Sequence, residues 1–365
     1  MEFKWLSEDF TQDRIILAGD IGGTNSNLAL VGLKNGHFTI LMESVYRSAA
    51  INGLIEPIQE VIAAGSAKDS RLVPSICCIS AAGPVENNYC HLTNCHWDVD
   101  GEVIQRSIGI PTLVINDFTA IGYGIPTLDV NNPAQITKLP HPDGSCPTPQ
   151  KGGPKAVVGA GTGLGVGYLV ATDGDQYIAC PSEGGHAGFA DFDQETRELK
   201  AFVSKKFTQS PGVEPFVSGQ GISNIYHFYK DVRGLLSDGV FAEIDALPDA
   251  DKPGLISKYS ATNEICKEIM RTFIKIYGAA TGSYSTIFIP SGGMYLAGGI
   301  AAKNEHLFLE DNLFMRYFEL NYREGIEAML KKIPVYIIKD YSISLYGAAN
   351  AAITLEHVRA SEARN

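Results

Sequence analysis

A short turn at residues 20 to 25 (DIGGTN) carries the first set of side chains and backbone groups with clear chemical potential. Glycine permits positive φ, so such a turn can point consecutive backbone N–H groups at a ligand, and the threonine and asparagine add side-chain donors. Donors in this arrangement suit a phosphate. A tight β-hairpin that only bonds its own turn is the alternative. The candidate phosphate-binding residues are Gly22, Gly23, Thr24 and Asn25.

Asp20 is the first residue of the same turn, and its position indicates a site for a magnesium ion. A carboxylate beside a bound phosphate would be repelled by it unless a cation lay between the two anions, in direct contact or through water. The turn is not a Walker A loop, since no GK[ST] sequence occurs in the chain. Asp20 is therefore the candidate contact for Mg²⁺ within a nucleotide site.

Two further glycine-rich segments have the same character. Residues 159 to 165 (GAGTGLG) contain four glycines, a density that favours close approach of a ligand to the backbone over an ordinary flexible turn. Residues 293 to 300 (GMYLAGGI) end an apolar stretch in Gly298 and Gly299, where a purine or ribose could pack, although a plain strand-to-helix turn fits equally well. The second segment contributes the candidate nucleotide contacts Gly161, Thr162 and Gly163.

The elements that must position these segments predict an α/β protein. Apolar runs bounded by turn residues indicate strands, and apolar residues at helical spacing indicate helices. The segment 131–155 is rich in Pro, Gly, Asn and Thr and is predicted to be a surface loop. We expect strands at 15–18, 28–31, 38–42, 75–79, 112–115, 156–158, 166–170 and 335–338, and helices at 51–65, 263–288 and 345–355.

The chain of 365 residues is longer than one hydrophobic core usually supports, so two lobes with a cleft between them are expected. Residues 23–31 and 161–169 resemble each other, which indicates two related halves. We predict a small α/β domain at residues 1–126, onto which a C-terminal helix at 339–357 packs back, and a large α/β domain at residues 127–338.

The composition favours a well-packed cytosolic enzyme. Hydrophobic residues make up 45% and charged residues 19% of the chain, and the formal net charge is −12. No Lys/Arg block, signal-peptide pattern or long apolar run is present, so we expect no nucleic-acid partner, no membrane partner and a cytoplasmic location. Seven cysteines suit reduced thiols. The sequence is compatible with a homodimer and does not specify the oligomeric state.

Five motifs together identify a family resemblance. The sequences DIGGTN at 20–25, INDF at 115–118, GAGTGLGV at 159–166, PSEGGH at 181–186 and YLAGGI at 295–300 resemble those of the bacterial-type glucokinases, in the family order and across nearly the whole chain. The resemblance implies the actin-like ATPase (ribonuclease H-like) fold, with two α/β lobes around a central cleft. It also implies phosphorylation of the glucose 6-hydroxyl by ATP with Mg²⁺.

The resemblance assigns Asp117 as the catalytic base and as a sugar contact, with Asn116 as its sugar-binding neighbour. The physical expectation agrees, because an aspartate near a helix N-terminus should stay ionised at neutral pH and can accept a hydroxyl proton. A simple helix N-cap is the alternative for Asp117.

The resemblance also assigns Glu183, His186 and Glu214 as sugar ligands. Carboxylate and imidazole groups suit a polyhydroxylated ligand because each can bind hydroxyls. Glu183 and His186 have the spacing of a helical metal pair, but two glycines between them favour a loop. An exposed loop charge is the alternative for Glu214. Asn94 is expected to border the same pocket, with loop packing as its alternative.

Two alternative functions are consistent with some of these motifs. A related hexose kinase would use another sugar acceptor or another phosphate donor. A non-catalytic nucleotide-binding protein of the actin-like superfold would keep the glycine segments and would not need the acidic and imidazole side chains together.

Overall fold

The structure is a computed structural model of the chain, and it describes residues 3–92, 95–172, 176–235 and 239–362. The residues form two compact units. Unit 1 comprises Met1–Asp129, Ala171–Cys180 and Asp340–Asn365, and unit 2 comprises Val130–Val170 and Pro181–Lys339. The finer domain boundaries at 126 and 338 remain a prediction. Among the described residues, no helix combines the length and apolar character needed to cross a bilayer.

Unit 1 is built on a six-stranded mixed sheet in the order β1-β4-β3-β2-β5-β9. Strands β2, β3 and β4 pair as antiparallel neighbours, and β2, β5 and β9 run parallel to one another. The strands are β1 (Phe3–Trp5), β2 (Arg14–Ile21), β3 (Asn25–Lys34), β4 (His37–Arg47), β5 (Ile76–Ala81) and β9 (Thr112–Asn116), and a small second sheet contains β6 (Val85–Glu86), β7 (Tyr89–Cys90) and β8 (Val99–Asp100).

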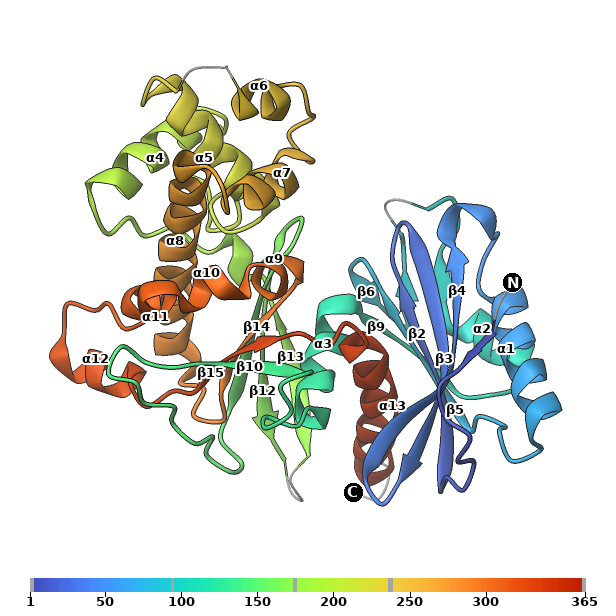
Figure 1. Cartoon of the computed structure of the whole chain (residues 1–365). Coiled ribbons are helices and arrows are strands. Elements are labelled where there is room, and N and C mark those ends of the chain that lie inside the picture. The colour runs from blue at the N-terminus through green and yellow to red at the C-terminus, as the bar shows by residue number, and fades with distance from the viewer. Residues whose placement is uncertain (1–2, 93–94, 173–175, 236–238, 363–365) are drawn as a thin grey trace. The chain divides into compact units, whose positions relative to one another are not determined.

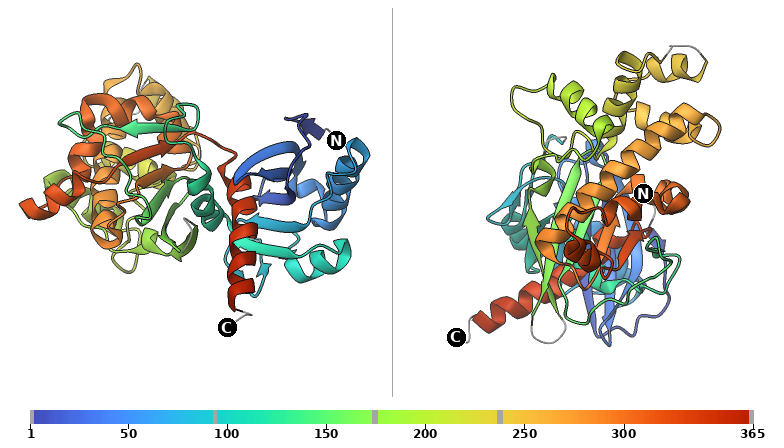
Figure 2. Two further views of the ribbon diagram at one scale, coloured as in Figure 1. Left: turned by 90° about the horizontal axis from the view of Figure 1, so that it is seen from below. Right: turned by 90° about the vertical axis from the view of Figure 1, so that its left-hand side faces the viewer.

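Helices cover both faces of this sheet (Figures 1 and 2). Alternate residues of a strand point to opposite faces. Accordingly, Ile15 and Leu17 pack in one core with α1 (Ile55–Lys68) and α2 (Gly101–Ile108). Their neighbours Ile16 and Ala18 pack in the other core with α3 (Asp117–Gly124) and the C-terminal helix α13 (Ile343–Glu362). Because both faces are buried, the strands read as continuous apolar runs in the sequence.

The sheet of unit 2 repeats the central part of this topology. Its six strands follow the order β10-β15-β14-β11-β12-β13, with β11 and β12 antiparallel and β11, β14 and β15 parallel. Ala171 of β12 and Tyr177–Cys180 of β13 are assigned to unit 1, although these strands continue the sheet of unit 2. In each unit, the first strand of a β-hairpin pairs with a parallel strand, and that strand pairs with a second parallel one: β2 with β5 and β9, and β11 with β14 and β15. Two related halves were expected from the sequence repeat. The strands are β10 (Ile136–Leu139), β11 (Lys155–Ala160), β12 (Leu164–Ala171), β13 (Tyr177–Ser182), β14 (Met294–Ala297) and β15 (Val335–Ile338).

The main core of unit 2 forms around the long helix α8 (Glu264–Phe288). Small residues let another helix approach it closely: a Cβ atom on Gly282 would lie 2.2 Å from the Phe318 carbonyl oxygen. The remaining helices of the unit are α4 (Gln194–Ser204), α5 (Gly219–Asp231), α6 (Val240–Asp245), α7 (Lys252–Tyr259), α9 (Gly299–Lys303), α10 (Glu305–Leu309), α11 (Leu313–Phe318) and α12 (Glu324–Leu330).

Most of the expected elements are present, with two notable differences. The segment 131–155, expected to be a loop, contains β10, which pairs antiparallel with β15. Only Ile136 and Leu139 of this short strand are buried, so its apolar pattern is too brief to read from the sequence. The final helix, expected at 345–355, extends to Glu362.

A buried hydrogen bond between His141 and Glu319 anchors the long segment that precedes β11. His141 is fully buried, and its Nδ1 lies 2.5 Å from Glu319 Oε1 while its Nε2 lies 3.0 Å from the Ile333 carbonyl oxygen. Glu319 is 7% exposed, and besides this contact with the imidazole its Oε2 lies 3.8 Å from Lys331 Nζ. The pair thus ties the segment to the ends of α11 and α12.

We predict that Glu319→Ala lowers the free energy of unfolding by about 3 kcal/mol, because it leaves a buried imidazole nitrogen without its partner. Urea denaturation followed by circular dichroism measures this change. Glu327→Ala is the matched control: it removes an exposed carboxylate that pairs with Lys331, and it should change stability by less than about 0.5 kcal/mol. Equal effects of the two substitutions would contradict the anchoring role.

Candidate functional site

The turn Gly22-Gly23-Thr24 joins β2 to β3 in unit 1, and Ser48 holds it in place. Ser48 Oγ donates to the Gly22 carbonyl at 2.7 Å, and Ser48 N–H donates to the Thr24 carbonyl at 3.0 Å. The backbone N–H groups of Gly23 and Thr24 have no acceptor among the described residues. Neither glycine has the positive φ expected from the sequence, because the turn closes through Gly22 N–H and the Asn25 carbonyl at 2.9 Å.

Asp20 lies near the end of β2, beside the polar side chains of Ser80 and Asn27. Ser80 on β5 donates to Asp20 Oδ1 at 3.5 Å. Burial, and secondly the negative charge of Asp117, raises the pKa of Asp20 to about 6. A carboxylate in this situation favours a nearby cation, because a cation would stabilise its charged form. Among the described residues there is no cluster of three or more His, Cys, Asp or Glu side chains that could hold a metal ion.

Asn116 and Asp117 lie where β9 ends and α3 begins. Asn116, not Asp117, is the N-cap of the helix: its Oδ1 accepts from Phe118 N–H at 3.0 Å and Thr119 N–H at 3.2 Å. The alternative of Asp117 as the N-cap is therefore wrong. Asp117 Oδ1 accepts from Asn116 Nδ2 at 2.9 Å and from Phe118 N–H at 2.8 Å.

This geometry leaves Asp117 Oδ2 without a hydrogen-bond donor among the described residues. Burial raises the pKa of Asp117, whereas the Phe118 N–H bond and the Asn116 side chain oppose that rise. The result is an oriented carboxylate with one oxygen fixed and the other able to accept a proton. Strand register places it near Asp20, because Ile21, Ala81 and Asn116 occupy matching positions on β2, β5 and β9.

In unit 2, the turn Gly161-Thr162-Gly163 joins β11 to β12. The N–H groups of Thr162 and Gly163 have no acceptor among the described residues. Glu214 braces the turn: its Oε2 accepts from Leu164 N–H at 2.8 Å. A Cβ atom at position 163 would lie 2.6 Å from that same oxygen, so the glycine is needed for this contact rather than for a positive φ.

Gly298 lies against the base of this turn. Its φ is 89°, and a Cβ atom here would lie 2.4 Å from the Ala160 carbonyl oxygen. The third glycine segment therefore contacts the second within unit 2, and Gly298 is the candidate that does require the left-handed conformation.

Glu183 and His186 belong to a 3₁₀ turn that follows β13, as the glycines between them indicated. Their side chains are 92% and 68% exposed, and Glu183 Oε2 lies 3.8 Å from His186 Nε2. The turn is close to Glu214, because Glu214 N–H donates to the Gly185 carbonyl at 2.9 Å. A Cβ atom on Gly185 would lie 2.3 Å from the Leu164 carbonyl oxygen, so the turn packs directly on the start of β12.

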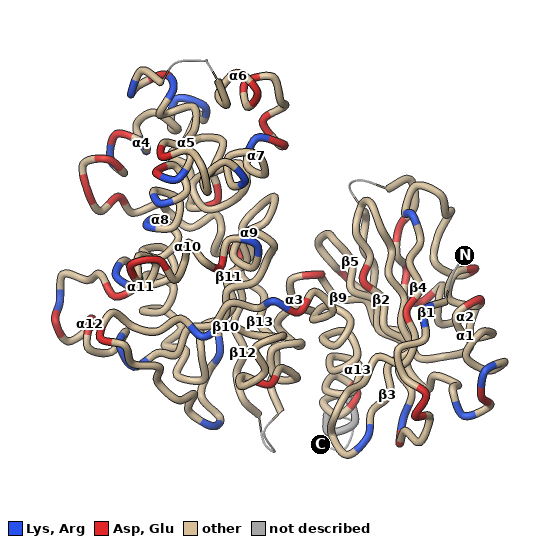
Figure 3. The backbone as a smooth tube through the Cα atoms, in the orientation of Figure 1, with Lys and Arg blue, Asp and Glu red and all other residues tan. Residues whose placement is uncertain are grey.

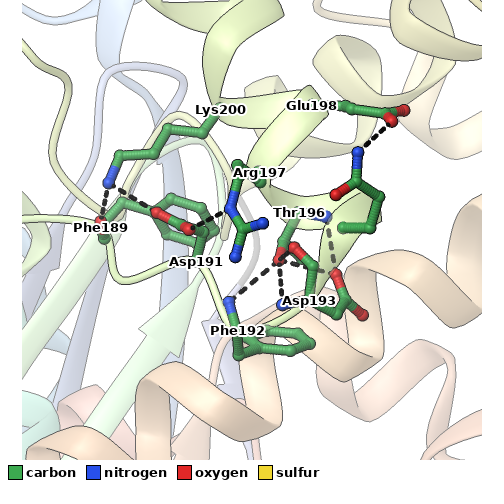
Figure 4. A network of polar contacts seen from close by, with 9 residues as sticks. Phe189, Asp191, Phe192, Asp193, Thr196, Arg197, Glu198 and Lys200 are labelled. Atoms are coloured by element: carbon green, nitrogen blue, oxygen red, sulfur yellow. Dashed lines mark hydrogen bonds and ion pairs between the residues drawn. The ribbon is translucent and has the colours of Figure 1, made fainter.

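A tyrosine holds the Glu183–His186 turn, and a lysine holds the segment that follows it. Tyr284 on α8 donates its hydroxyl to the Gly184 carbonyl at 2.7 Å, and its side chain is almost fully buried. The segment that follows is fixed by the network in Figure 4: Lys200 Nζ donates to the Phe189 carbonyl at 2.8 Å and to Asp191 Oδ1 at 3.0 Å. The exposed sugar-ligand candidates therefore stand on a rigid support.

A cavity of about 670 Å³ opens in unit 2 beside the second glycine turn. Its wall includes Gly161 and Thr162, the start of α5 at Gly219, Ser257 of α7, and Gly299. Cavities of this size hold nucleotide-sized ligands. The structure thus brings the second and third glycine segments to one cavity, together with residues of α5 and α7.

The matching family model covers residues 17–355 and is described as Glucokinase. The chain belongs to the glucokinase family. The resemblance inferred from the five motifs is therefore confirmed.

Relatives across the family have full-length similarity to this member. It is 35% identical over 358 residues to the glucokinase of Nostoc punctiforme, covering 93% of this chain and 99% of the relative. It is 31% identical to the glucokinase of Photorhabdus laumondii, covering 91% and 95% respectively. The crystal structure of a glucokinase from an Antarctic psychrotroph superposes with a TM-score of 0.79 at 26% identity, over 94% of this chain and 100% of that one. The two-domain α/β kinase fold is thus confirmed for this family member.

The sequence left part of this glucokinase-family site unassigned. Ser48, Ser80, Gly219, Ser257 and Tyr284 contact or line the candidate site through distant segments. A Ser-Gly-x-Gly sequence at 218–221 could have indicated a helix start, but the other four have no local signal. Asn94 lies outside the described residues, so its predicted role stays a prediction.

We predict that Tyr284→Phe lowers stability by about 1 kcal/mol and raises the Kd for glucose about threefold to tenfold, because the Glu183–His186 turn loses its hydroxyl support. Calorimetric titration with glucose measures the affinity. Tyr277→Phe is the matched control from the same helix: it also loses a buried hydroxyl bond, to the Val158 carbonyl at 3.0 Å, and should leave glucose affinity unchanged. Equal glucose affinities in the two variants would contradict the support role.

We predict that Asp20→Asn stabilises the protein at pH 7 and not at pH 4, in the absence of nucleotide and Mg²⁺. The folded carboxyl keeps its proton up to about pH 6, whereas the unfolded one releases it near 3.8, so the wild type loses stability as pH rises through this window. The gain at pH 7 should be about 2–3 kcal/mol in the free energy of unfolding. Denaturant titrations at both pH values measure it, and an equal difference at pH 4 and pH 7 would contradict the pKa assignment.

Proposed function

We propose that the candidate residues of both units act on the same two substrates, glucose and ATP, with Asp117 as the catalytic base. As a member of the glucokinase family, the chain is an enzyme that phosphorylates glucose at the expense of ATP, giving glucose 6-phosphate and ADP. The observation that supports the assignment of the base is the unpartnered Oδ2 of Asp117 at the end of β9.

The reaction is an in-line displacement. The 6-hydroxyl oxygen of glucose attacks the γ-phosphorus, the bond from that phosphorus to the bridging oxygen of ADP breaks, and the hydroxyl proton passes to Asp117 Oδ2. The two donors on Oδ1 fix the orientation of the carboxylate, so the free oxygen needs no reorientation during the transfer. The raised pKa of Asp117 makes it a stronger base than an exposed aspartate.

We assign glucose binding to Asn94, Asn116, Asp117, Glu183, His186 and Glu214. The carboxylate and imidazole groups of unit 2 lie within one connected turn system, which suits several hydroxyls of one sugar. Two solved glucokinases with related folds are described in complex with glucose, one from Balamuthia mandrillaris and one from Streptomyces griseus, the latter also with AMPPNP. These complexes support a shared substrate class for this chain.

We assign the phosphates of ATP to the turns at Gly22–Asn25 and Gly161–Gly163, whose free N–H groups suit an anion. The nucleoside belongs in the cavity of unit 2 beside Gly298 and Gly299. Asp20 fits Mg²⁺, in direct contact or through water, because its charged form is destabilised until a cation is near. When bound, Mg²⁺ supplies positive charge that offsets the charge of the phosphates.

We further propose that the two units have the actin-like ATPase (ribonuclease H-like) fold with a central cleft. The equivalent order of hairpin and parallel strands in both sheets supports this proposal. A small domain at 1–126 with helix 339–357, a large domain at 127–338, a cytoplasmic location and a compatible homodimer remain the predictions from the sequence.

We predict that Asp117→Asn lowers kcat for glucose phosphorylation by about 10²–10⁴-fold, because the amide cannot accept the hydroxyl proton. A coupled assay of glucose 6-phosphate formation measures kcat, and the KM values should change far less. Asp13→Asn, which alters an exposed carboxylate of the same unit, is the control and should retain full activity. An Asp117→Asn enzyme with undiminished kcat would remove Asp117 from the role of base.

A further inference from the structure

Two lysines line the cavity of unit 2 and belong to none of the motifs found in the sequence. Lys206 follows α4, and Lys303 ends α9, so they come from segments almost 100 residues apart. Both side chains belong to exposed residues. We propose that Lys206 and Lys303 form a cationic clamp for the polyphosphate of the nucleotide, a role that rests on the proposed nucleotide site.

The charge of Lys206 is held at the cavity by a neutral partner. Its Nζ donates to Asn224 Oδ1 at 2.8 Å, and Asn224 is 2% exposed and anchored by a bond from its Nδ2 to the Pro215 carbonyl at 2.8 Å. An amide oxygen positions an ammonium group without cancelling its charge. Lys206 is therefore oriented and still able to attract an anion.

Lys303 lies beside the third glycine segment. Its Nζ is 3.9 Å from the position that a Cβ atom on Gly299 would occupy, an ordinary van der Waals separation, so the ammonium group lies next to Gly299 at the cavity wall. Within the part of the chain that the structure describes, neither Lys303 nor Lys206 forms an ion pair with a carboxylate.

Other lysines of the unit do pair with carboxylates. The helices around the cavity carry both signs of charge (Figure 3), and neighbouring lysines such as Lys200, Lys230 and Lys252 each pair with an aspartate. In a chain of net charge −12, two unneutralised cations at one cavity point to an anionic ligand.

Asp249 contributes a carboxylate to the cavity wall, and in the described part of the chain it forms no ion pair with Lys206 or Lys303. Its Oδ1 lies 2.9 Å from His227 Nε2 and 3.1 Å from Lys252 Nζ, so its charge is already balanced by other groups. The floor is neutral, since Ser257 Oγ donates to Asn304 Oδ1 at 2.6 Å and Asn304 Nδ2 donates to the Ile300 carbonyl at 2.8 Å. The cavity thus offers an uncharged floor and a positive rim, which suits a nucleoside that carries phosphates.

The test is the binding of ADP, AMP, adenosine and inorganic tripolyphosphate to the full-length protein, measured by calorimetric titration. Lys206→Met and Lys303→Met remove the charge and keep a similar length. Each substitution should weaken the binding of ADP and of tripolyphosphate about 10-fold, because it removes a charge-assisted contact. The affinity for adenosine should change by less than about twofold. The salt dependence of ADP binding should also become shallower in the double variant.

Lys205→Met and Lys332→Met are the matched controls, since both residues are exposed and neither lines the cavity; they should bind all four probes as the wild type does. The clamp is refuted if the cavity variants bind ADP normally, or if they lose adenosine as strongly as ADP. Failure of the wild type to bind ADP would instead overturn the proposed nucleotide site together with the clamp. Direct titration with glucose checks that every variant keeps its sugar site.

Discussion

The alignment of parallel strands with a β-hairpin is the constraint on which each half of the site depends. In unit 1, hydrogen bonding between β2, β5 and β9 fixes the ends of these strands in register, so the turn at Gly22 and the carboxylate of Asp117 must lie at one sheet edge. In unit 2, the pairing of β11 with β14 does the same for the turn at Gly161 and for Gly298. The positions of these candidate residues thus follow from backbone pairing, and the helices on both faces of the unit 1 sheet protect that pairing from water.

Around this frame, several polar side chains bond to backbone atoms of the turns. Ser48 bonds both sides of the first turn, Glu214 bonds the start of β12, and Tyr284 bonds the Glu183–His186 turn. Side chains that bond to main-chain groups of a rigid strand or helix hold a ligand site with little loss of conformational entropy on binding. The functional side chains thus stay available for substrates.

The sequence predicted those parts of the protein whose signal is local. The strands that flank the glycine turns and the long helix α8 have clear apolar patterns, and each of the five motifs is a short continuous segment. The expectation of positive φ in the first turn was wrong, because that turn closes through Gly22 N–H and the Asn25 carbonyl. In the second turn, Gly163 allows the close approach of Glu214, and in the third segment Gly298 does have a positive φ. Contacts between distant segments, such as Tyr284 with Gly184 or the walls of the unit 2 cavity, could not be predicted, since no local pattern encodes them.

The contact between Gly163 and Glu214 has a consequence for interpreting substitutions in this protein. An alanine at position 163 would push first against the glutamate carboxylate, 2.6 Å from the added carbon, and not against a nucleotide. With Glu214 as the sugar ligand that we propose, a substitution in the proposed phosphate turn would lower the affinity for carbohydrate. The residues that affect the two proposed binding functions would then overlap at position 163.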